Sequence, residues 1–244
     1  MEAQKLFAAD YFSYIELFVV PGSFGKCITL WRNIKAPFVI HAPHYMSGLN
    51  LSQYSDRQSN FAMIREVMEF ADMLKADEII FHPGVGGDIQ ETIAQLKDIN
   101  DQRILIENKP YRAIVDELTC NGNSPEDIKL VMDNTGCAFC LDIGHAIYSA
   151  NFRKVDPWEY FNKFLELRPV MYHLTDGDFQ GVTDQHKHFG EGDFPIERIL
   201  KTIPQDSRIT IETKRESEIS LDDTMEDVEY LMRICNCSGS DVKA

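Results

Sequence analysis

Short apolar runs alternate with amphipathic segments along the whole chain, and no Pro-, Gly- or Ser-rich linker or low-complexity block separates them. Runs of roughly four to seven residues that are apolar nearly throughout are typical of parallel strands buried on both faces. The predicted strands cover residues 14–20, 38–41, 78–82, 103–107, 138–142, 170–174 and 208–212. Because nothing interrupts the alternation, we expect one domain over residues 1–235, followed by a polar, disordered tail over residues 236–244.

Several helix starts are marked by a Ser or Asp that is followed three positions later by an acidic or amide residue. Ser55, Ser124 and Asp156 have this pattern, with Pro directly after the last two, and it is typical of helix N-caps. The helix after Ser55 carries an apolar stripe that we expect to pack on a sheet. This stripe consists of Phe61, Ile64, Met68, Ala71 and Leu74.

The repeated order of strand and helix predicts an α/β protein, and the natural closed form of such a series is the TIM (β/α)8-type barrel. The usual first strand of that barrel is missing or irregular, because the chain begins with a helix predicted over residues 3–9 that ordinarily follows it. A doubly wound open sheet is the structural alternative. Such a sheet normally carries a Gly-rich phosphate turn after an early strand, which this sequence lacks, so the barrel is favoured.

Composition narrows the classes of partner. The chain has 39 Asp and Glu against 24 Lys and Arg, a formal net charge of −15, so its overall charge repels phosphate backbones and anionic membranes. A hydrophobic content of 44% excludes a chain that stays unfolded in water. No apolar run is long enough to span a bilayer, and the N-terminus does not resemble a signal peptide. We therefore expect a soluble, cytoplasmic protein without a membrane partner.

The six cysteines do not form the pattern of a disulfide framework in a chain of this length without an export signal. Cys137 and Cys140 form a C-x-x-C motif, which raises a redox or zinc-ribbon hypothesis. No second such motif accompanies it, and Cys140 lies within a predicted apolar strand. We therefore interpret both residues as small hydrophobic side chains.

The histidines carry the strongest functional signal. All seven lie at the end of a predicted strand or in the loop after it, and none lies in a predicted helix; they are His41, His44, His82, His145, His173, His186 and His188. Carboxylates recur at the same places, namely Glu107, Asp142, Asp184 and Glu212. A single histidine of this kind is more often a hydrogen-bonded structural residue than a ligand. Because these strand ends share one face of a parallel barrel, the whole set predicts a site for one or more divalent metal ions.

Short motifs around these residues resemble one known family. They are Phe81-His82-Pro83-Gly84, Ile106-Glu107-Asn108, Leu141-Asp142-Ile143-Gly144-His145-Ala146, His173-Leu174-Thr175-Asp176, Asp184-Gln185-His186, Gly190-Glu191-Gly192-Asp193 and Ile211-Glu212-Thr213. In this order they are similar to the motifs of the endonuclease IV and xylose isomerase-like TIM barrels, also called AP endonuclease family 2. The resemblance runs from about Tyr14 to the last predicted helix.

The resemblance implies up to three zinc ions. The implied ligands are His41, His82, Glu107, Asp142, His145, His173, Asp184, His186 and Glu212. One ion would take His82, Glu107 and an earlier histidine, either His41 or His44, of which we favour His41. A second would take Glu107 as a bridge with Asp142, His173 and Glu212, and a third would take His145, Asp184 and His186. The candidates for substrate contacts are His44, Tyr45, Lys109 and His188.

Three functions are consistent with this pattern. The first is a zinc-dependent phosphoesterase resembling endonuclease IV, acting on a small phosphorylated substrate or on abasic DNA; the acidic balance opposes duplex binding. The second is a sugar or sugar-phosphate isomerase or epimerase, in which Glu107 and Glu212 move a proton beside one manganese, magnesium or cobalt ion. The third is a barrel without catalytic activity. The filled ligand positions favour the first, with Glu107 and Glu212 as the expected catalytic residues.

Overall fold

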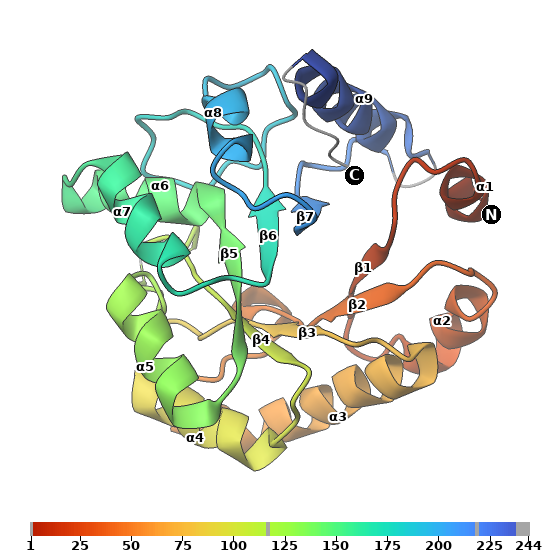
Figure 1. Cartoon of the computed structure of the whole chain (residues 1–244). Helices are drawn as coiled ribbons and strands as arrows, with labels where there is room; N and C mark the ends of the chain where they lie inside the picture. Colours follow the sequence, from red (N-terminus) through yellow and green to blue (C-terminus); the bar gives the residue numbers. More distant parts are fainter. Residues whose placement is uncertain (1, 116–117, 218–219, 238–244) are drawn as a thin grey trace.

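The computed structural model describes residues 2–115, 118–217 and 220–237. Seven strands in these ranges form one parallel sheet in the order of the chain, so that each strand pairs with its sequence neighbours. Figure 1 shows the sheet curving into a nearly closed barrel. The strands are β1 (Ile15–Phe18), β2 (Phe38–His41), β3 (Ile79–Phe81), β4 (Ile104–Glu107), β5 (Ala138–Asp142), β6 (Met171–Leu174) and β7 (Arg208–Ile211). The predicted TIM-barrel fold class is confirmed.

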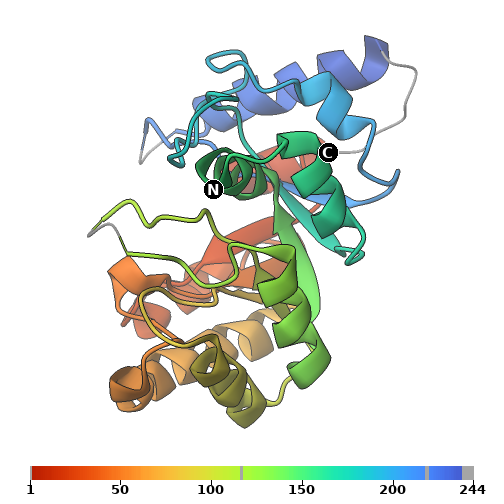
Figure 2. The same ribbon diagram turned by 90° about the vertical axis from the view of Figure 1, so that its left-hand side faces the viewer.

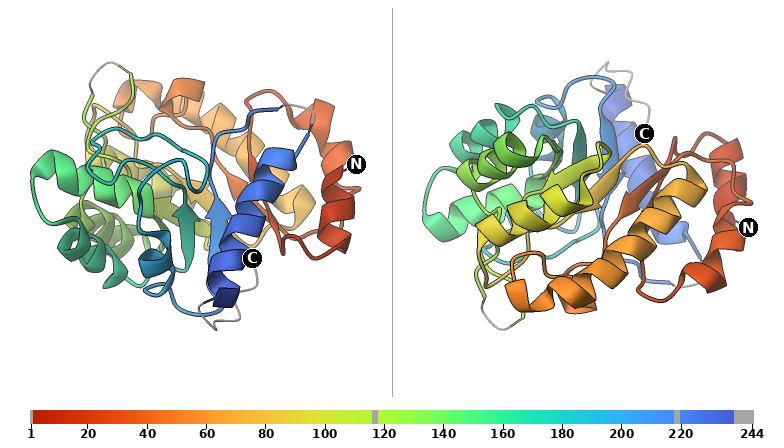
Figure 3. Two further views of the ribbon diagram at one scale, coloured as in Figure 1. Left: turned by 90° about the horizontal axis from the view of Figure 1, so that it is seen from above. Right: turned by 90° about the horizontal axis from the view of Figure 1, so that it is seen from below.

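Helices lie between successive strands and cover the outside of the barrel (Figures 1 and 3). They are α1 (Glu2–Ala8), α2 (Phe24–Trp31), α3 (Arg57–Leu74), α4 (Ile89–Ile99), α5 (Pro125–Thr135), α6 (Ile143–Arg153), α7 (Pro157–Leu165), α8 (Ile196–Leu200) and α9 (Asp222–Cys237), with two short 3-10 turns, η1 (Tyr45–Ser47) and η2 (Tyr54–Asp56). Ser124 and Asp156 cap α5 and α7 as predicted, because each side chain accepts a backbone N–H of the first turn. Within the described ranges, no helix has the length and apolar character needed to cross a membrane.

The barrel interior has an apolar layer beneath a polar layer. Val39, Ile80, Leu105, Cys140 and Met171 form one buried cluster, with one residue from each of the five central strands. Since side chains alternate between the two faces of a strand, the residue two positions later also points inward. Those residues are His41, His82, Glu107, Asp142 and His173. The apolar cluster is therefore the floor on which the polar residues rest.

The opening between β1 and β7 corresponds to the missing strand. No backbone pairing joins these two strands in the described sheet, but side chains join them: Tyr14 donates to Thr210 Oγ1 at 2.9 Å, and Thr210 donates to Glu16 Oε2 at 2.7 Å. The first helix and the last helix, α1 and α9, lie on this side of the molecule (Figures 1 and 3). The barrel is thus closed at this seam by hydrogen-bonded side chains in place of a strand ladder.

Some local expectations need correction. The apolar stripe of α3 is wrong at Phe61, whose side chain is exposed, whereas Val67 and Phe70 are buried. The buried residues of α3 are Asn60, Ile64, Val67, Phe70 and Ala71, so the face that packs inward passes through Asn60 instead of Phe61. Cys27, Cys120, Cys137 and Cys140 are free thiols. Helix α9 continues through Cys237, and residues 238–244 of the predicted tail lie outside the described residues.

Replacement of Thr210 by Val tests the seam. The variant keeps the shape of the side chain but leaves the Tyr14 hydroxyl and the Glu16 carboxylate without their shared partner, so we expect the free energy of unfolding to fall by about 1–3 kcal/mol. Urea unfolding measures this change. Thr29→Val, on the exposed part of α2, is the matched control and should change stability by less than about 0.5 kcal/mol. Equal effects of the two substitutions would show that the seam does not depend on Thr210.

Candidate metal centre

The candidate ligands gather at the carboxyl ends of the strands. His41, Glu107 and Asp142 are the last residues of β2, β4 and β5. His82 and Glu212 directly follow β3 and β7, and His173 lies in β6. The loops after β4 and β6 extend on this same side of the barrel (Figure 2). The nine side chains expected from the sequence are therefore brought to one end of the molecule. Four overlapping sets with metal-ligand spacing occur among them, and three of these sets are treated below as ligand groups.

The first ligand group is centred on Glu107, a carboxylate with a side chain that is 1% exposed. Its Oε2 atom lies 3.2 Å from His41 Nε2 and 3.1 Å from His82 Nε2, and these three residues form a set with metal-ligand spacing. His44 belongs to none of these sets among the described residues. Its ring stacks over His82, with 6.3 Å between the centroids. Of these two histidines, His41 is therefore the one that lies in the first ligand group.

The second ligand group consists of Glu107, His173 and Glu212. His173 Nδ1 lies 3.3 Å from Glu212 Oε1 and 3.4 Å from Glu107 Oε2, yet it makes no hydrogen bond with any described group. Asp142 lies beside this group rather than within it. Its Oδ1 atom accepts the His145 backbone N–H at 2.7 Å, and it forms a set with Glu107 and His145 instead.

Glu16 in β1 is part of the site and was not predicted. Its Oε2 atom accepts a hydrogen bond from His173 Nε2 at 3.0 Å and another from Thr210 at 2.7 Å. This contact places the proton on His173 Nε2 and leaves Nδ1 directed at the other two carboxylates, as in carboxylate–histidine–metal triads. The available signal was an acidic residue within an apolar strand, since such a residue needs a buried partner.

The third ligand group consists of His145, Asp184 and His186. Both imidazole Nε2 atoms converge on Asp184 Oδ2, at 3.1 Å from His145 and 2.7 Å from His186. The other carboxylate oxygen, Asp184 Oδ1, is buried without a hydrogen-bond partner among the described residues. His145 was expected in a loop; it lies in the first turn of α6, because that helix begins directly after β5 with Asp142 as its N-cap.

The loop that carries Asp184 and His186 is held in place by backbone contacts. Asp176 accepts N–H groups from the part of the loop around Gly190 and Gly192, at 2.8 and 3.1 Å. His186 has a left-handed backbone with φ of 49°, a conformation that costs a non-glycine residue about 1–2 kcal/mol. It is held there because its Nδ1–H donates to Glu212 O at 2.6 Å and its carbonyl accepts from Lys214 N at 2.9 Å. These contacts direct His186 Nε2 toward Asp184.

Lys109 reaches into the first ligand group. Its Nζ atom lies 3.0 Å from Glu107 Oε1 and 3.4 Å from His82 Nε2, and the side chain is only 17% exposed. Burial by itself would lower the pKa of this ammonium, but Glu107 and Asp142 raise it, so Lys109 is charged. Burial and the Lys109 charge together lower the pKa of His82 to about 3, so His82 is neutral at pH 7.

The four expected substrate contacts divide into two places. His44, Tyr45 and Lys109 line a cavity of about 450 Å³ together with seven of the nine candidate ligands. His188 is not among the lining residues, because its Nδ1–H donates to the buried Asp227 of α9 at 2.8 Å. The structure therefore brings three of the four candidates to the site. It places His188 where it fastens the loop to the last helix.

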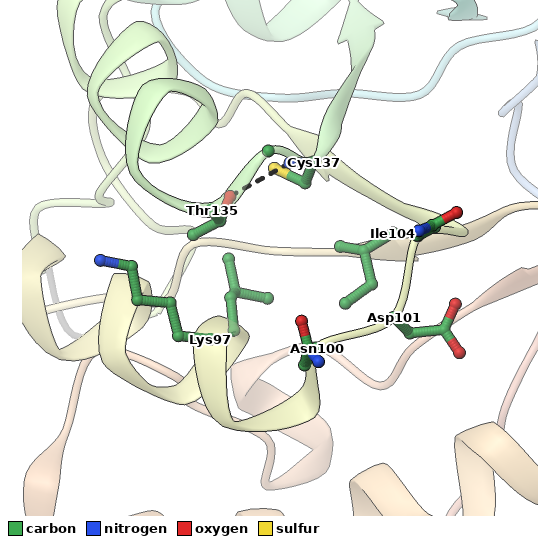
Figure 4. A pocket seen from close by; sticks show the side chains of 9 residues that line it. Lys97, Asn100, Asp101, Ile104, Thr135 and Cys137 are labelled. Carbon is green, nitrogen blue, oxygen red and sulfur yellow. Dashed lines mark hydrogen bonds between the residues drawn. The ribbon is translucent and has the colours of Figure 1, made fainter.

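A second hollow, of about 530 Å³, lies at the opposite end of the barrel between the ends of α4 and α5 (Figure 4). Lys97, Asn100, Asp101, Thr135 and Cys137 are among the residues around it, and no histidine lines it. In TIM barrels, the end where the strands begin serves stability, and the opposite end carries the chemistry. We therefore place the candidate active site in the smaller cavity.

The residues present fit bound divalent cations. In the third ligand group, three atoms with lone pairs face one another across 2.7–3.1 Å, because both Nδ1–H groups are already donated to backbone carbonyls. Only protons or a cation can stabilise such an arrangement. The unpartnered His173 Nδ1 and Asp184 Oδ1 atoms provide further free ligand atoms. Imidazole and carboxylate ligands suit zinc and manganese-like ions.

The parallel barrel, with histidines gathered at the end where its strands finish, indicates a particular class of TIM-barrel protein. Comparison with known families identifies that class. The family model described as xylose isomerase-like TIM barrel matches residues 25–234. The chain belongs to this family, which confirms the family resemblance of its strand-end motifs.

The proteins to which this chain is similar are named for different enzymatic reactions. A protein of Carboxydothermus hydrogenoformans, named probable endonuclease 4, is 26% identical over 175 residues, which cover 64% of this chain and 60% of that protein. The crystal structure of a D-tagatose 3-epimerase-like protein matches with a TM-score of 0.71 and 22% identity over 93% of this chain and 89% of the other. Endonuclease IV from Thermus thermophilus matches with a TM-score of 0.66 and 18% identity over 97% and 92%. The two structures show the same fold as this chain.

Replacement of Glu16 by Gln tests its effect on the second ligand group. The amide no longer accepts as a charged group, so His173 Nδ1 becomes a weaker ligand, and we expect zinc affinity to fall about 10- to 100-fold. Titration against a competing zinc chelator measures this change. Glu197→Gln, on the exposed surface of α8, is the matched control and should leave the affinity unchanged. An unaltered affinity in Glu16→Gln would contradict the role assigned to this contact.

Zinc binding should release protons at pH 7. Burial alone would lower the pKa of His145 and of His186, but Asp142 and Asp184 raise the first to about 10, and Asp184 raises the second to about 9. Both imidazoles therefore hold an extra proton below these values, and zinc must displace it, so we expect affinity to increase as the pH rises toward 9. Calorimetry in buffers of different ionisation enthalpy measures the protons released. An observed heat that does not depend on the buffer would contradict the expectation.

Proposed function

We propose that the protein is a divalent-metal phosphoesterase that hydrolyses a small phosphate ester. The observation that carries this proposal is the third ligand group, in which His145 and His186 converge on Asp184 beside the groups centred on Glu107. A single-metal isomerase has no need of such a second cluster, whereas phosphate ester hydrolysis uses neighbouring cations to stabilise the attacking and leaving oxygens. Zinc is the ion that this ligand set suits best.

The size and lining of the cavity support a small substrate. A volume of about 450 Å³ is in the range of small-molecule sites. Part of the wall is apolar, since Phe18, Met46 and Ile114 lie there with side chains that are partly exposed. An apolar wall on an acidic protein offers little to a DNA backbone. A sugar phosphate or a nucleotide-sized ester is therefore favoured over an abasic duplex.

The residues of the chain divide the chemistry between them. Bound divalent cations supply positive charge for the phosphate oxygens and make water more acidic. Burial would raise the pKa of Glu212, but His173 holds it well below the usual range, so this carboxylate is ionised. Its side chain is 22% exposed, against 1% for Glu107. Glu212, the more exposed of the two, is thus placed to accept a hydrogen bond from water in the cavity and orient it, while Glu107 positions the surrounding histidines.

An isomerase or epimerase is the second candidate. Glu107 and Glu212 both lie within 3.4 Å of His173 Nδ1, an arrangement that also suits proton transfer beside a single ion. The likeness to a D-tagatose 3-epimerase-like protein supports the same candidate. The isomerase reaction does not require the third ligand group, whereas the proposed phosphoesterase reaction does. A variant that lacks this group therefore distinguishes the two functions.

Substitution of Asp184 by Asn discriminates between these candidates. For the phosphoesterase we expect kcat for hydrolysis of aryl or sugar phosphates to fall at least about 100-fold, because the third group loses its shared carboxylate. For the isomerase, conversion of a ketose should be nearly unaffected. Both activities are measured on zinc-loaded and manganese-loaded protein, with an abasic duplex as a third substrate.

Asp133→Asn, an exposed position on α5 that pairs with Lys129, is the matched control and should keep full activity. Hydrolysis of phosphate esters that persists in Asp184→Asn would show that the third ligand group is not required for the reaction, and the argument from that group would fail. Ketose conversion by the unaltered protein, without phosphate release from any ester, would establish the isomerase instead.

A further inference from the structure

The first and third ligand groups each contain two imidazoles and one carboxylate, but only the first has a lysine beside its carboxylate. In each group, two imidazole Nε2 atoms converge on a single carboxylate oxygen, at 3.1–3.2 Å in the first group and 2.7–3.1 Å in the third. In the third group the second carboxylate oxygen, Asp184 Oδ1, has no hydrogen-bond partner among the described residues. In the first group the corresponding atom, Glu107 Oε1, accepts from the Lys109 ammonium at 3.0 Å.

Like the third ligand group, the second contains a buried atom without a hydrogen-bond partner. His173 Nδ1 is buried and makes no hydrogen bond with a described group. Among the described ligand atoms of the first group none is buried without a partner: Glu107 Oε2 contacts His41 Nε2 and His82 Nε2, and Lys109 Nζ contacts Glu107 Oε1 and His82 Nε2. Among the three groups, buried atoms without a hydrogen-bond partner are thus found in the second and third; outside the groups, His44 Nδ1, in the ring stacked on His82, is also unpartnered among the described residues.

Lys109 is held in this position by its own backbone. Its N–H donates to Gly122 O at 3.1 Å, and its carbonyl accepts from the Ser149 hydroxyl of α6 at 3.2 Å. The preceding residue, Asn108, is also fixed, because its side chain donates to Asp142 O and accepts from Asp142 N at 2.9 and 2.8 Å. The side chain of Lys109 therefore starts from a clamped segment and extends toward Glu107.

A lysine ammonium and a divalent cation would compete for the same carboxylate. The Lys109 ammonium contacts two of the three ligands of the first group, Glu107 at 3.0 Å and His82 at 3.4 Å, whereas its contact with the second group is through the shared Glu107. The first group carries one carboxylate and two imidazoles, so the ammonium already balances its charge. No comparable ammonium contact is found for Asp184 among the described residues, where its partners are the two imidazoles.

We propose that Lys109 takes the place of the metal ion that His41, His82 and Glu107 would otherwise hold, so that the chain binds two divalent cations instead of three. The two ions are held by the second and third ligand groups. Lys109 then provides a fixed positive charge at the first ligand group, where the third ion would otherwise lie, and contacts an anionic substrate group directly. The inference rests on the proposed metal-dependent function but concerns only the number and position of the ions.

Zinc content measured by mass spectrometry tests the number of ions. After loading with zinc and removal of free metal, the unaltered protein should hold about two ions per chain, and Lys109→Met should hold about three, because Met has similar length and no charge. Lys109→Arg keeps the charge and should hold two. Lys163→Met, an exposed position on α7, is the matched control and should also hold two. Thermal unfolding establishes that each variant is folded.

Anomalous diffraction from zinc-loaded crystals of the unaltered protein tests the positions and does not depend on any variant. We expect peaks beside His173 and beside Asp184, and none between His41 and His82. Three ions in the unaltered protein, or a peak between those two histidines, would overturn the inference, as would a Lys109→Met variant that folds and still holds two. Because the readout is metal content, two ions without hydrolysis of any phosphate ester would leave this inference standing and remove the proposed function.

Discussion

One buried carboxylate, Glu107, connects most of the site. It lies at the end of β4 and contacts His41 from β2, His82 from the end of β3 and Lys109 from its own loop, while His145 and His173 approach within 3.3 and 3.4 Å. Burial would raise the pKa of this carboxyl group, but Lys109 and the histidines hold it well below its usual range. An unpaired charge at this depth would cost several kcal/mol, so the surrounding cations and donors are required for the strands to meet here.

The geometry of the barrel explains why such a charge can be buried at all. Each central strand contributes one apolar residue to the interior and then, two positions later, one polar residue. The polar residues therefore form a single layer above an apolar floor, and they make hydrogen bonds with one another instead of facing hydrocarbon. At the seam between β1 and β7, where a strand ladder is absent from the described sheet, Thr210 and Glu16 extend this layer. The same two residues thus contribute to barrel closure and to the orientation of His173.

Much of this arrangement was predictable, and the exceptions have physical reasons. The seven strands and their parallel order followed from the apolar runs, because a strand buried on both faces must be apolar throughout. The family was identified from the motifs at the strand ends. Glu16 was missed because one acidic residue in an apolar run has no partner in its own segment; its partners, His173 and Thr210, lie more than 150 residues away in the chain. Phe61 was misplaced because helix periodicity defines a stripe without defining which way the helix turns on the sheet.

The sequence by itself determined the class of fold, the face on which the candidate ligands lie and the residue types that gather there, since all three depend on local patterns that repeat along the chain. The tertiary structure alone decided which of two nearby histidines faces Glu107, that His188 is fastened to α9, and that Lys109 extends to the same carboxylate. These contacts join residues from different strands and loops. Their geometry depends on how strands and loops approach one another, which local sequence patterns do not encode.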